Sequence, residues 1–256
     1  MSTLLLASLA TLVFCAPGYP GGAGDAQPFI EQFATAATAI SGWPSGSLAA
    51  VYDPTEQGGL AKLSAPEAVL AFVPYAFYVQ HGGELHLTPI AQADVAGIGP
   101  KERWTLVAKE GAVSTPSSLA GYTLLSAAGY APDFVRHVAL EAWPLPPDVK
   151  IESTGQLLSA LRRIAAGEHV VALLDQTQAA ALPTLPFAAQ LKAVTQSAPL
   201  PVAVVAVVNG RVPAARLRTL QQGLLKMSHE AADADALGQL RLKGFVTPEL
   251  PSHSSP

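Results

Sequence analysis

The chain has 256 residues, of which half are hydrophobic and 13% are charged, and its formal net charge is −4. A chain this long and this apolar can bury a sizeable core, which excludes a largely disordered protein. It has no basic cluster longer than the pair Arg162–Arg163, which argues against nucleic acid as a partner because phosphate binding needs concentrated positive charge.

The chain begins with an apolar segment that contains two expected elements. Residues 1–10 (MSTLLLASLA) are typical of the apolar part of an export signal, without its positive start, and we expect them to be a signal remnant. Residues 11–16 (TLVFCA) predict a first buried strand. The segment is too short to span a membrane. We therefore expect an exported, periplasmic protein, and a lipid anchor on Cys15 is disfavoured because Phe14 stands where a small residue is required.

Strand and helix patterns then alternate along the chain. The expected strands cover residues 47–53, part of 66–80, 83–95, 103–109, 121–127, 148–153, 169–175, 190–197 and 201–210. The expected helices cover residues 26–40, a short stretch from Tyr75, 132–143, 154–168, 177–182, 213–228 and 230–239. Alternating βα units predict parallel or mixed sheets covered by helices, with ligands at the carboxyl ends of the strands.

Two loops that follow strands share a Gly-Tyr pair, Gly18-Tyr19 and Gly129-Tyr130. Both could be ordinary strand-to-helix turns. Alternatively, two helix N-termini and two tyrosines could face one cleft, where backbone N–H groups suit a polar or anionic ligand. A nucleotide site is not expected, because the first loop has neither a P-loop ending nor a G-x-G-x-x-G pattern.

An ordered set of segments carries a family resemblance, led by APGYPGGAGDAQPFIEQFA, AVLAFVPYAFYVQHG, SLAGYTLLSAAGYAPDFVRHVAL, STGQLLSALRRIAAGEHVVALLDQTQ and SAPLPVAVVAVV. The chain resembles type II periplasmic solute-binding proteins, in particular the phosphate/phosphite/phosphonate-binding receptors of ABC transporters. The resemblance implies an α/β fold of two lobes, each a mixed, mostly parallel sheet flanked by helices, with two crossover strands as the hinge. TLVAK would lead out of lobe one and PVAVVAV would lead back. Lobe one would comprise residues 11–104 and 203–250, lobe two 105–202, and a flexible tail 251–256.

The resemblance transfers few site residues. Phosphonate-binding members have a Ser-Thr-Ser run at the start of the first helix of lobe two, where this chain has Ala127-Ala128-Gly129-Tyr130. Their histidine at the next helix aligns near Thr154-Gly155-Gln156, without an imidazole. The acid after the following strand matches Asp175, and an aromatic after the third strand matches Tyr75. The departures imply a changed ligand, or loss of transport binding, on a retained scaffold.

The remaining polar residues have simpler interpretations. Asp175 could cap the helix at residue 177 or accept a donor from a ligand, and the sequence leaves both open. Asp53 and Glu56 are expected to serve turn chemistry, and Cys15 to be an inert core thiol. The histidines lack metal-site spacing, so neither a metal nor a cofactor is expected.

We therefore expect a non-enzymatic, monomeric, extracytoplasmic protein that captures a small polar or anionic ligand, such as a phosphonate- or phosphate-like compound, between two lobes. Its partners would be that small molecule and an ABC transporter permease. The expected ligand contacts are Tyr19, Gln27, Tyr75, Gly129, Tyr130, Thr154, Gln156 and Asp175. The alternatives are a sensory homologue that serves a membrane kinase and an enzyme on the same scaffold.

Overall fold

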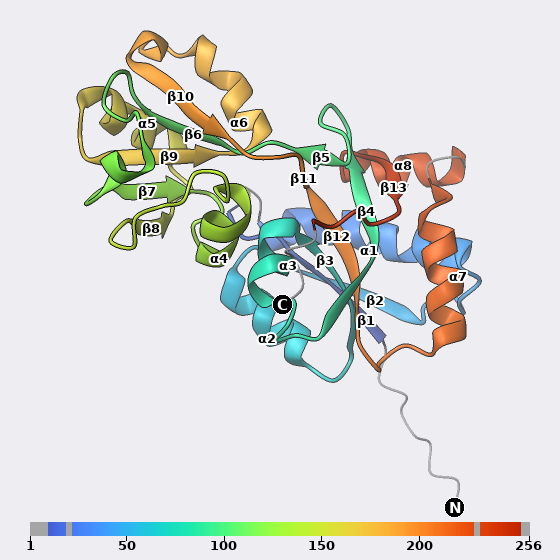
Figure 1. The fold of residues 1–256 in the computed structure, drawn as a ribbon. Coiled ribbons are helices and arrows are strands. Elements are labelled where there is room, and N and C mark those ends of the chain that lie inside the picture. Colours follow the sequence, from blue (N-terminus) through green and yellow to red (C-terminus); the bar gives the residue numbers. More distant parts are fainter. Residues whose placement is uncertain (1–9, 19–21, 228–230, 252–256) are drawn as a thin grey trace, which may run out of the picture.

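The computed structural model describes residues 10–18, 22–227 and 231–251 and shows two lobes joined by a narrow waist (Figure 1). Each lobe is built around its own sheet. The N-terminal strand and the C-terminal elements belong to the same lobe, so the chain leaves this lobe once and returns to it. This is the expected two-lobed α/β architecture.

The first lobe contains a six-stranded sheet in the order β13-β4-β12-β3-β1-β2. Its strands are β1 (Ala10–Cys15), β2 (Leu48–Asp53), β3 (Ala68–Pro74), β4 (Leu87–Val95), β12 (Ala203–Val208) and β13 (Leu242–Val246). β1 is parallel to β2 and β3, whereas β12 is antiparallel to β3 and β4. The sheet is therefore mixed, but the expectation that it would be mostly parallel is wrong for its strand pairings, because β13 is also antiparallel to β4.

Helices cover both faces of this sheet because its strands are apolar on both sides. In β1, Leu12 and Phe14 face a cluster that includes Phe33, while Val13 and Cys15 face the opposite cluster, as expected from the two-residue period of a strand. α1 (Ala23–Ile40), α7 (Ala214–Leu224) and α8 (Ala231–Gln239) lie on the first face, and α2 (Glu56–Ser64) and α3 (Tyr75–His81) on the second.

The second lobe contains a five-stranded sheet in the order β10-β6-β9-β7-β8. Its strands are β6 (Thr105–Lys109), β7 (Thr123–Ser126), β8 (Lys150–Ser153), β9 (Val170–Leu174) and β10 (Leu191–Gln196). Its longer helices are α5 (Leu157–Ala166) and α6 (Gln176–Ala181), and short 3₁₀ turns occur at Pro116–Leu119, Leu182–Thr184 and Ala188–Gln190. β7 is parallel to β8 and β9, so the loops after these three strands meet at one edge.

The waist is formed by two short antiparallel strands, β5 (Lys101–Glu102) and β11 (Leu200–Pro201) (Figure 1). The expectation of two crossover strands is right. The crossing, however, comes just before TLVAK and PVAVVAV: TLVAK is β6 of the second sheet, and most of PVAVVAV is β12 of the first. A two-stranded connection of this kind is a natural hinge, because few backbone hydrogen bonds cross it.

Two helical segments differ from the sequence expectation. The helix expected over 132–143 is an α-helical turn, α4 (Pro132–Phe134), followed by a π-helical segment, Val135–Ala139. Leu140 N donates to Val135 O at 3.1 Å, an i to i−5 bond, and Pro144 and Pro146 follow shortly. The expected helix is therefore too long.

α2 is the second difference, because the sequence was interpreted as a turn there. Its two glycines lower helix propensity, but they let the helix lie close to the sheet. A Cβ at Gly59 would stand 2.1 Å from Cys15 Sγ. The turn interpretation of Asp53 is confirmed, since its Oδ1 accepts a hydrogen bond from Thr55 N at 2.9 Å. Glu56 instead begins α2 and lies 2.8 Å from His81 Nε2.

Candidate ligand site between the lobes

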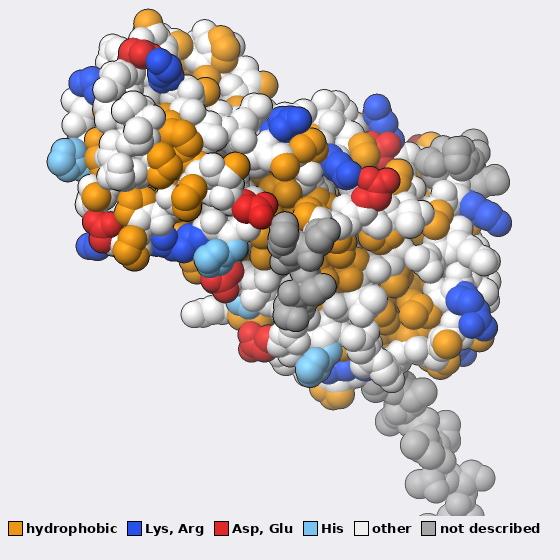
Figure 2. Space-filling view, viewed as in Figure 1, with side chains coloured by type: hydrophobic (Ala, Val, Ile, Leu, Met, Phe, Trp, Pro, Cys, Tyr) orange, Lys and Arg blue, Asp and Glu red, His pale blue; other side chains and the backbone are white. Residues whose placement is uncertain are grey.

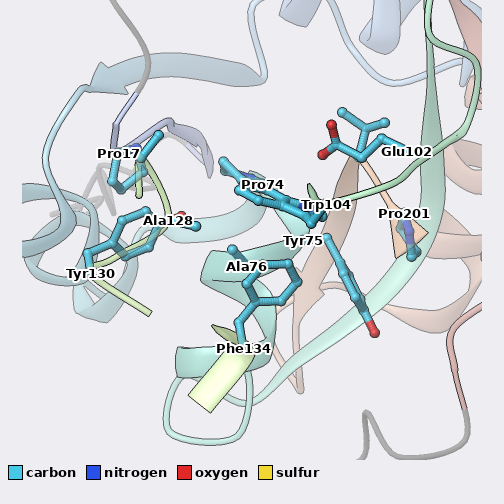
Figure 3. A pocket seen from close by; sticks show the side chains of 12 residues that line it. Pro17, Pro74, Tyr75, Ala76, Glu102, Trp104, Ala128, Tyr130, Phe134 and Pro201 are labelled. Carbon is cyan, nitrogen blue, oxygen red and sulfur yellow. The ribbon is translucent and has the colours of Figure 1, made fainter. Parts of the chain in front are cut away.

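The lobes are packed together on the side of α3 and α4. The Phe134 ring of the second lobe packs edge to face on Tyr75 and Trp104, with ring centroids 6.1 and 5.3 Å apart. Tyr75 and Phe134 are each 1% exposed and belong to a hydrophobic cluster that draws on both lobes. Figure 3 shows this compartment, in which the Tyr75 hydroxyl points away from the other side chains. The cavity that remains is about 10 Å³, about the size of one water.

Polar contacts also join the lobes on this side. Asp133 N donates to Gln80 Oε1 at 3.0 Å, and Gln80 Nε2 donates to Asp133 Oδ2 at 3.3 Å. The backbone at Gly18 lies so close to the second lobe that a Cβ there would stand 2.3 Å from Ala127 O. We call this region the packed compartment, defined by Pro17, Tyr75, Trp104, Tyr130 and Phe134. It has no room for a solute in this conformation.

Three backbone donors of the turn before α4 are already occupied. Ala128 N donates to Ser126 Oγ at 3.1 Å, Gly129 N donates to Ser126 O at 3.1 Å, and Ala131 N donates to Ala128 O at 2.9 Å. Ser126 is itself buried and fixed by its bond to Leu173 O at 2.8 Å. An anion at this turn would therefore have to compete with internal hydrogen bonds.

An open cavity of about 610 Å³ lies beside α1 and α6, and we call it the groove. Its walls come from the carboxyl ends of β1 and β3, from α1, and from the end of β4, and α6 of the second lobe closes one side. Hydrophobic side chains dominate these walls, among them Phe14, Ile30, Phe72 and Ile98. Ligand sites of mixed α/β sheets lie at the carboxyl ends of strands, as the groove does.

Two carboxylates lie at the hinge end of the groove. Asp175 Oδ1 accepts from Gln178 N at 2.8 Å, and Asp175 N donates to Gln178 Oε1 at 3.2 Å, which completes a capping box at the start of α6. The capping interpretation of Asp175 is therefore confirmed, and the same side chain lines the groove. Glu102 comes from β5, and its side chain accepts a long hydrogen bond, 3.5 Å, from Gln176 N.

Burial sets the protonation of these two acids. Glu102 is 3% exposed and Asp175 is 6% exposed. Burial, followed by the repulsion of Asp175, raises the pKa of Glu102 to about 8, and burial raises the pKa of Asp175. Figure 3 shows the Glu102 carboxylate directed away from the Tyr75 ring. A carboxyl that is neutral near pH 7 and becomes charged when a cation approaches can discriminate between ligands by charge.

Comparison with known proteins places this architecture in a family. The family of periplasmic substrate-binding proteins of ABC phosphonate transporters matches residues 88–253. The chain belongs to this family. The resemblance inferred from the ordered segments is thus confirmed, and with it a solute-binding role outside the cytoplasm. Among curated proteins, no sequence matches.

Solved structures agree on the fold of this solute-binding protein. Xanthomonas citri XAC2383, solved with ATP, has 17% identity and a TM-score of 0.68, covering 96% of this chain and 93% of its own. PhnD1 from Prochlorococcus marinus, in complex with methylphosphonate, has 11% identity and a TM-score of 0.61, covering 94% and 93%. A phosphonate-transporter binding protein from Pseudomonas aeruginosa has 15% identity and a TM-score of 0.60, covering 94% and 82%. At these identities the likeness shows the fold alone.

The other expected contacts of the binding protein are dispersed. Tyr75 and Tyr130 line the packed compartment. Gln27 lies near the start of α1, and its Nε2 donates hydrogen bonds to Glu31 Oε1 and to Ala50 O. Tyr19 lies outside the described residues. Of the expected set, the groove therefore contains Asp175.

Three further expected contacts lie at the β7–β8 edge. A Cβ at Gly129 would stand 2.2 Å from Glu152 O, so this glycine is required by the close approach of two backbone segments. Thr154 Oγ1 accepts from Gln156 N at 3.1 Å, which organises the start of α5. Gln156 is exposed and lines neither cavity. Their role as ligand contacts stays a prediction.

Sequence reasoning missed Glu102 and Phe134. Glu102 lies in a strand of two residues at the waist, where no periodicity can be recognised. Its burial depends on β11 and α6, which are distant in sequence. Phe134 falls within the helix expected over residues 132–143, and no separate role is expected for it there. The available signal was its place in the first helical turn after β7, since strand-end loops of the two lobes meet there.

Proposed function

We propose that the protein captures one small solute in the groove and presents it to the permease of an ABC transporter. The observation that supports this most is the position of the groove, which is walled by both lobes and lies next to the hinge strands β5 and β11. Its volume of about 610 Å³ falls within the range of small-molecule sites, roughly 300–1,000 Å³. Rotation of the lobes about the hinge would open and close it.

The bodies that move are proposed to be residues 11–104 with 203–250 and residues 105–202. The strands of the two sheets fall within these ranges, apart from Ala10 at the start of β1. Because the family consists of substrate-binding components, the protein would bind without catalysis, and one copy suffices because both walls come from one chain.

Phosphonate is not the ligand favoured by this chain's residues. PhnD1 was solved with methylphosphonate, and XAC2383 with ATP and with chloride, all of them anions. Here the turn after β7 has Ala127 and Ala128 in place of hydroxyls, and its backbone donors bond Ser126 and Ala128. The groove presents two acids at its hinge end. We therefore propose a polar solute without an oxyanion group.

Native mass spectrometry of freshly purified protein tests the function, followed by thermal shift with any solute it releases. A solute at 100 times its Kd should stabilise the fold by about 2.7 kcal/mol. Ala203→Phe, which fills the groove, should abolish that shift, whereas Gln156→Ala, outside it, should not. A shift lost in Gln156→Ala and kept in Ala203→Phe would move the site to the start of α5. Absence of any retained or stabilising solute would contradict the proposed function.

A further inference from the structure

The two carboxylates in the groove have no cationic partner within the described residues. None of the ion pairs there includes Glu102 or Asp175. The two basic residues next to Glu102 along the chain are engaged elsewhere: Lys101 Nζ lies 2.6 Å from Glu249, and Arg103 donates to Ser197 O at 2.7 Å. Ionising two buried acids that face an open cavity without a counter-charge is costly in free energy, unless a bound cation provides that charge.

The rest of the groove is apolar and partly aromatic. Phe14 and Phe72 pack with ring centroids 4.9 Å apart, and both line it together with Tyr52 and Ile98. Hydrophobic side chains are also exposed on the face of the first lobe in Figure 2, where lysines and arginines are scattered. An apolar wall suits the hydrocarbon part of a ligand, and aromatic rings attract a cation placed over their faces.

Among the described residues, Arg241 is the basic side chain that lines the groove. It is exposed and lies at the start of β13, the end of the groove bounded by Val95 and Leu242. It does not contribute to the raised pKa of Glu102, which burial and Asp175 cause. Its guanidinium therefore leaves the acidic end of the groove uncompensated.

We propose that the groove binds a small organic cation with an apolar body, whose charge lies against Glu102 and Asp175 and whose hydrocarbon part lies along Phe14 and Phe72. This inference rests on the proposed function, since it names the class of solute for the same groove. An ammonium group would provide the counter-charge that the chain itself does not, and an oxyanion would be repelled by both acids once Glu102 is ionised.

Protonation of Glu102 makes the binding depend on pH. A permanently charged ligand binds the ionised carboxylate, and the pKa of Glu102 is about 8. The ionised fraction rises about tenfold from pH 7 to pH 9, so the affinity should rise by about the same factor. The other charged groups around this end are Asp175 at the N-cap of α6, Lys101 in β5, Arg103 just after β5, and Arg241 just before β13.

The test is isothermal titration calorimetry with three probes of matched size: benzyltrimethylammonium, benzyl alcohol and benzylphosphonate. We expect the cation to bind, about tenfold more tightly at pH 9 than at pH 7, and to exceed both other probes by more than tenfold at pH 9. Benzyl alcohol or benzylphosphonate binding as tightly as the cation would overturn this inference and leave the solute-binding proposal standing. Failure of the cation to bind would also overturn it, while a solute retained in native mass spectrometry would still support the proposed function.

Variants assign the binding to the two acids. Glu102→Gln should weaken binding of the cation more than tenfold at pH 9 and remove its dependence on pH. Asp175→Asn should weaken it while preserving the cap of α6, because asparagine is as good a cap as aspartate. Glu110→Gln removes an exposed acid that pairs with Lys192 away from the groove, and it should leave binding unchanged. Equal affinity of the wild type and a folded Glu102→Gln protein would refute the assignment.

Discussion

Replacement of Glu102 by glutamine should flatten the dependence of folding stability on pH. The pKa of Glu102 rises from 4.5 to about 8 in the folded protein, so the folded state holds this proton more tightly than the unfolded state. Its stabilising contribution is complete below pH 4.5 and is lost as the pH rises to about 8. Each tenfold change in proton affinity is worth ~1.4 kcal/mol, which sets an upper limit of about 5 kcal/mol for this loss. Glutamine has no proton to lose.

Urea unfolding followed by circular dichroism at pH 5, 7 and 9 measures the effect without ligand. The wild type should lose several kcal/mol more than Glu102→Gln between pH 5 and pH 9. Glu249→Gln is the control, because Lys101 lowers the pKa of Glu249 and keeps it ionised over this range. Parallel curves for the wild type and Glu102→Gln would show that Glu102 ionises freely, and the account of the groove's charge would then be wrong.

Two substitutions and one chemical labelling experiment test the packing around the site. Phe134→Ala should destabilise the protein by about 3–5 kcal/mol in urea unfolding, because the ring joins the lobes. For the same reason, the radius of gyration from solution scattering should increase. Gly129→Ala should destabilise the β7–β8 edge strongly, while Gly155→Ala, with open space around it, should change the unfolding midpoint little; equal effects would contradict the close approach. Burial raises the pKa of Cys15 to about 12, so Ellman's reagent should react with it only on unfolding, and rapid reaction of the native protein would contradict its burial.

The sequence contains most of the architecture because the strands are strongly apolar and follow one another in chain order. The runs TLVFCA, HVVALLD and PVAVVAVV correspond to β1, β9 and β12. Elements that depend on distant contacts were harder to predict. α2 contains two glycines that disfavour a helix but allow it to lie close to β1 and β2. β5 pairs with a strand almost 100 positions later in the chain.

The site was less predictable than the fold, because the expected contacts were chosen from loops one at a time. Asp175 could be singled out because an acid directly after a buried strand is a recognisable pattern, and it lines the groove. Tyr75 was also expected as a ligand contact, but its ring is enclosed between the lobes by Phe134. Which strand-end loops form the groove and which are packed together depends on how the lobes close, and local spacing does not encode that. Glu102 was missed for a related reason, since the pairing of β6 with β9, which are distant in the chain, is what brings it near Asp175.

A crystal structure of the protein saturated with benzyltrimethylammonium at pH 9 tests the central claim most directly. We expect density for the cation in the groove, with its nitrogen near Glu102 and Asp175 and its ring along Phe14 and Phe72. Density in the packed compartment beside Tyr130, or a groove that stays empty at saturation, would contradict the claim that the groove is the solute site.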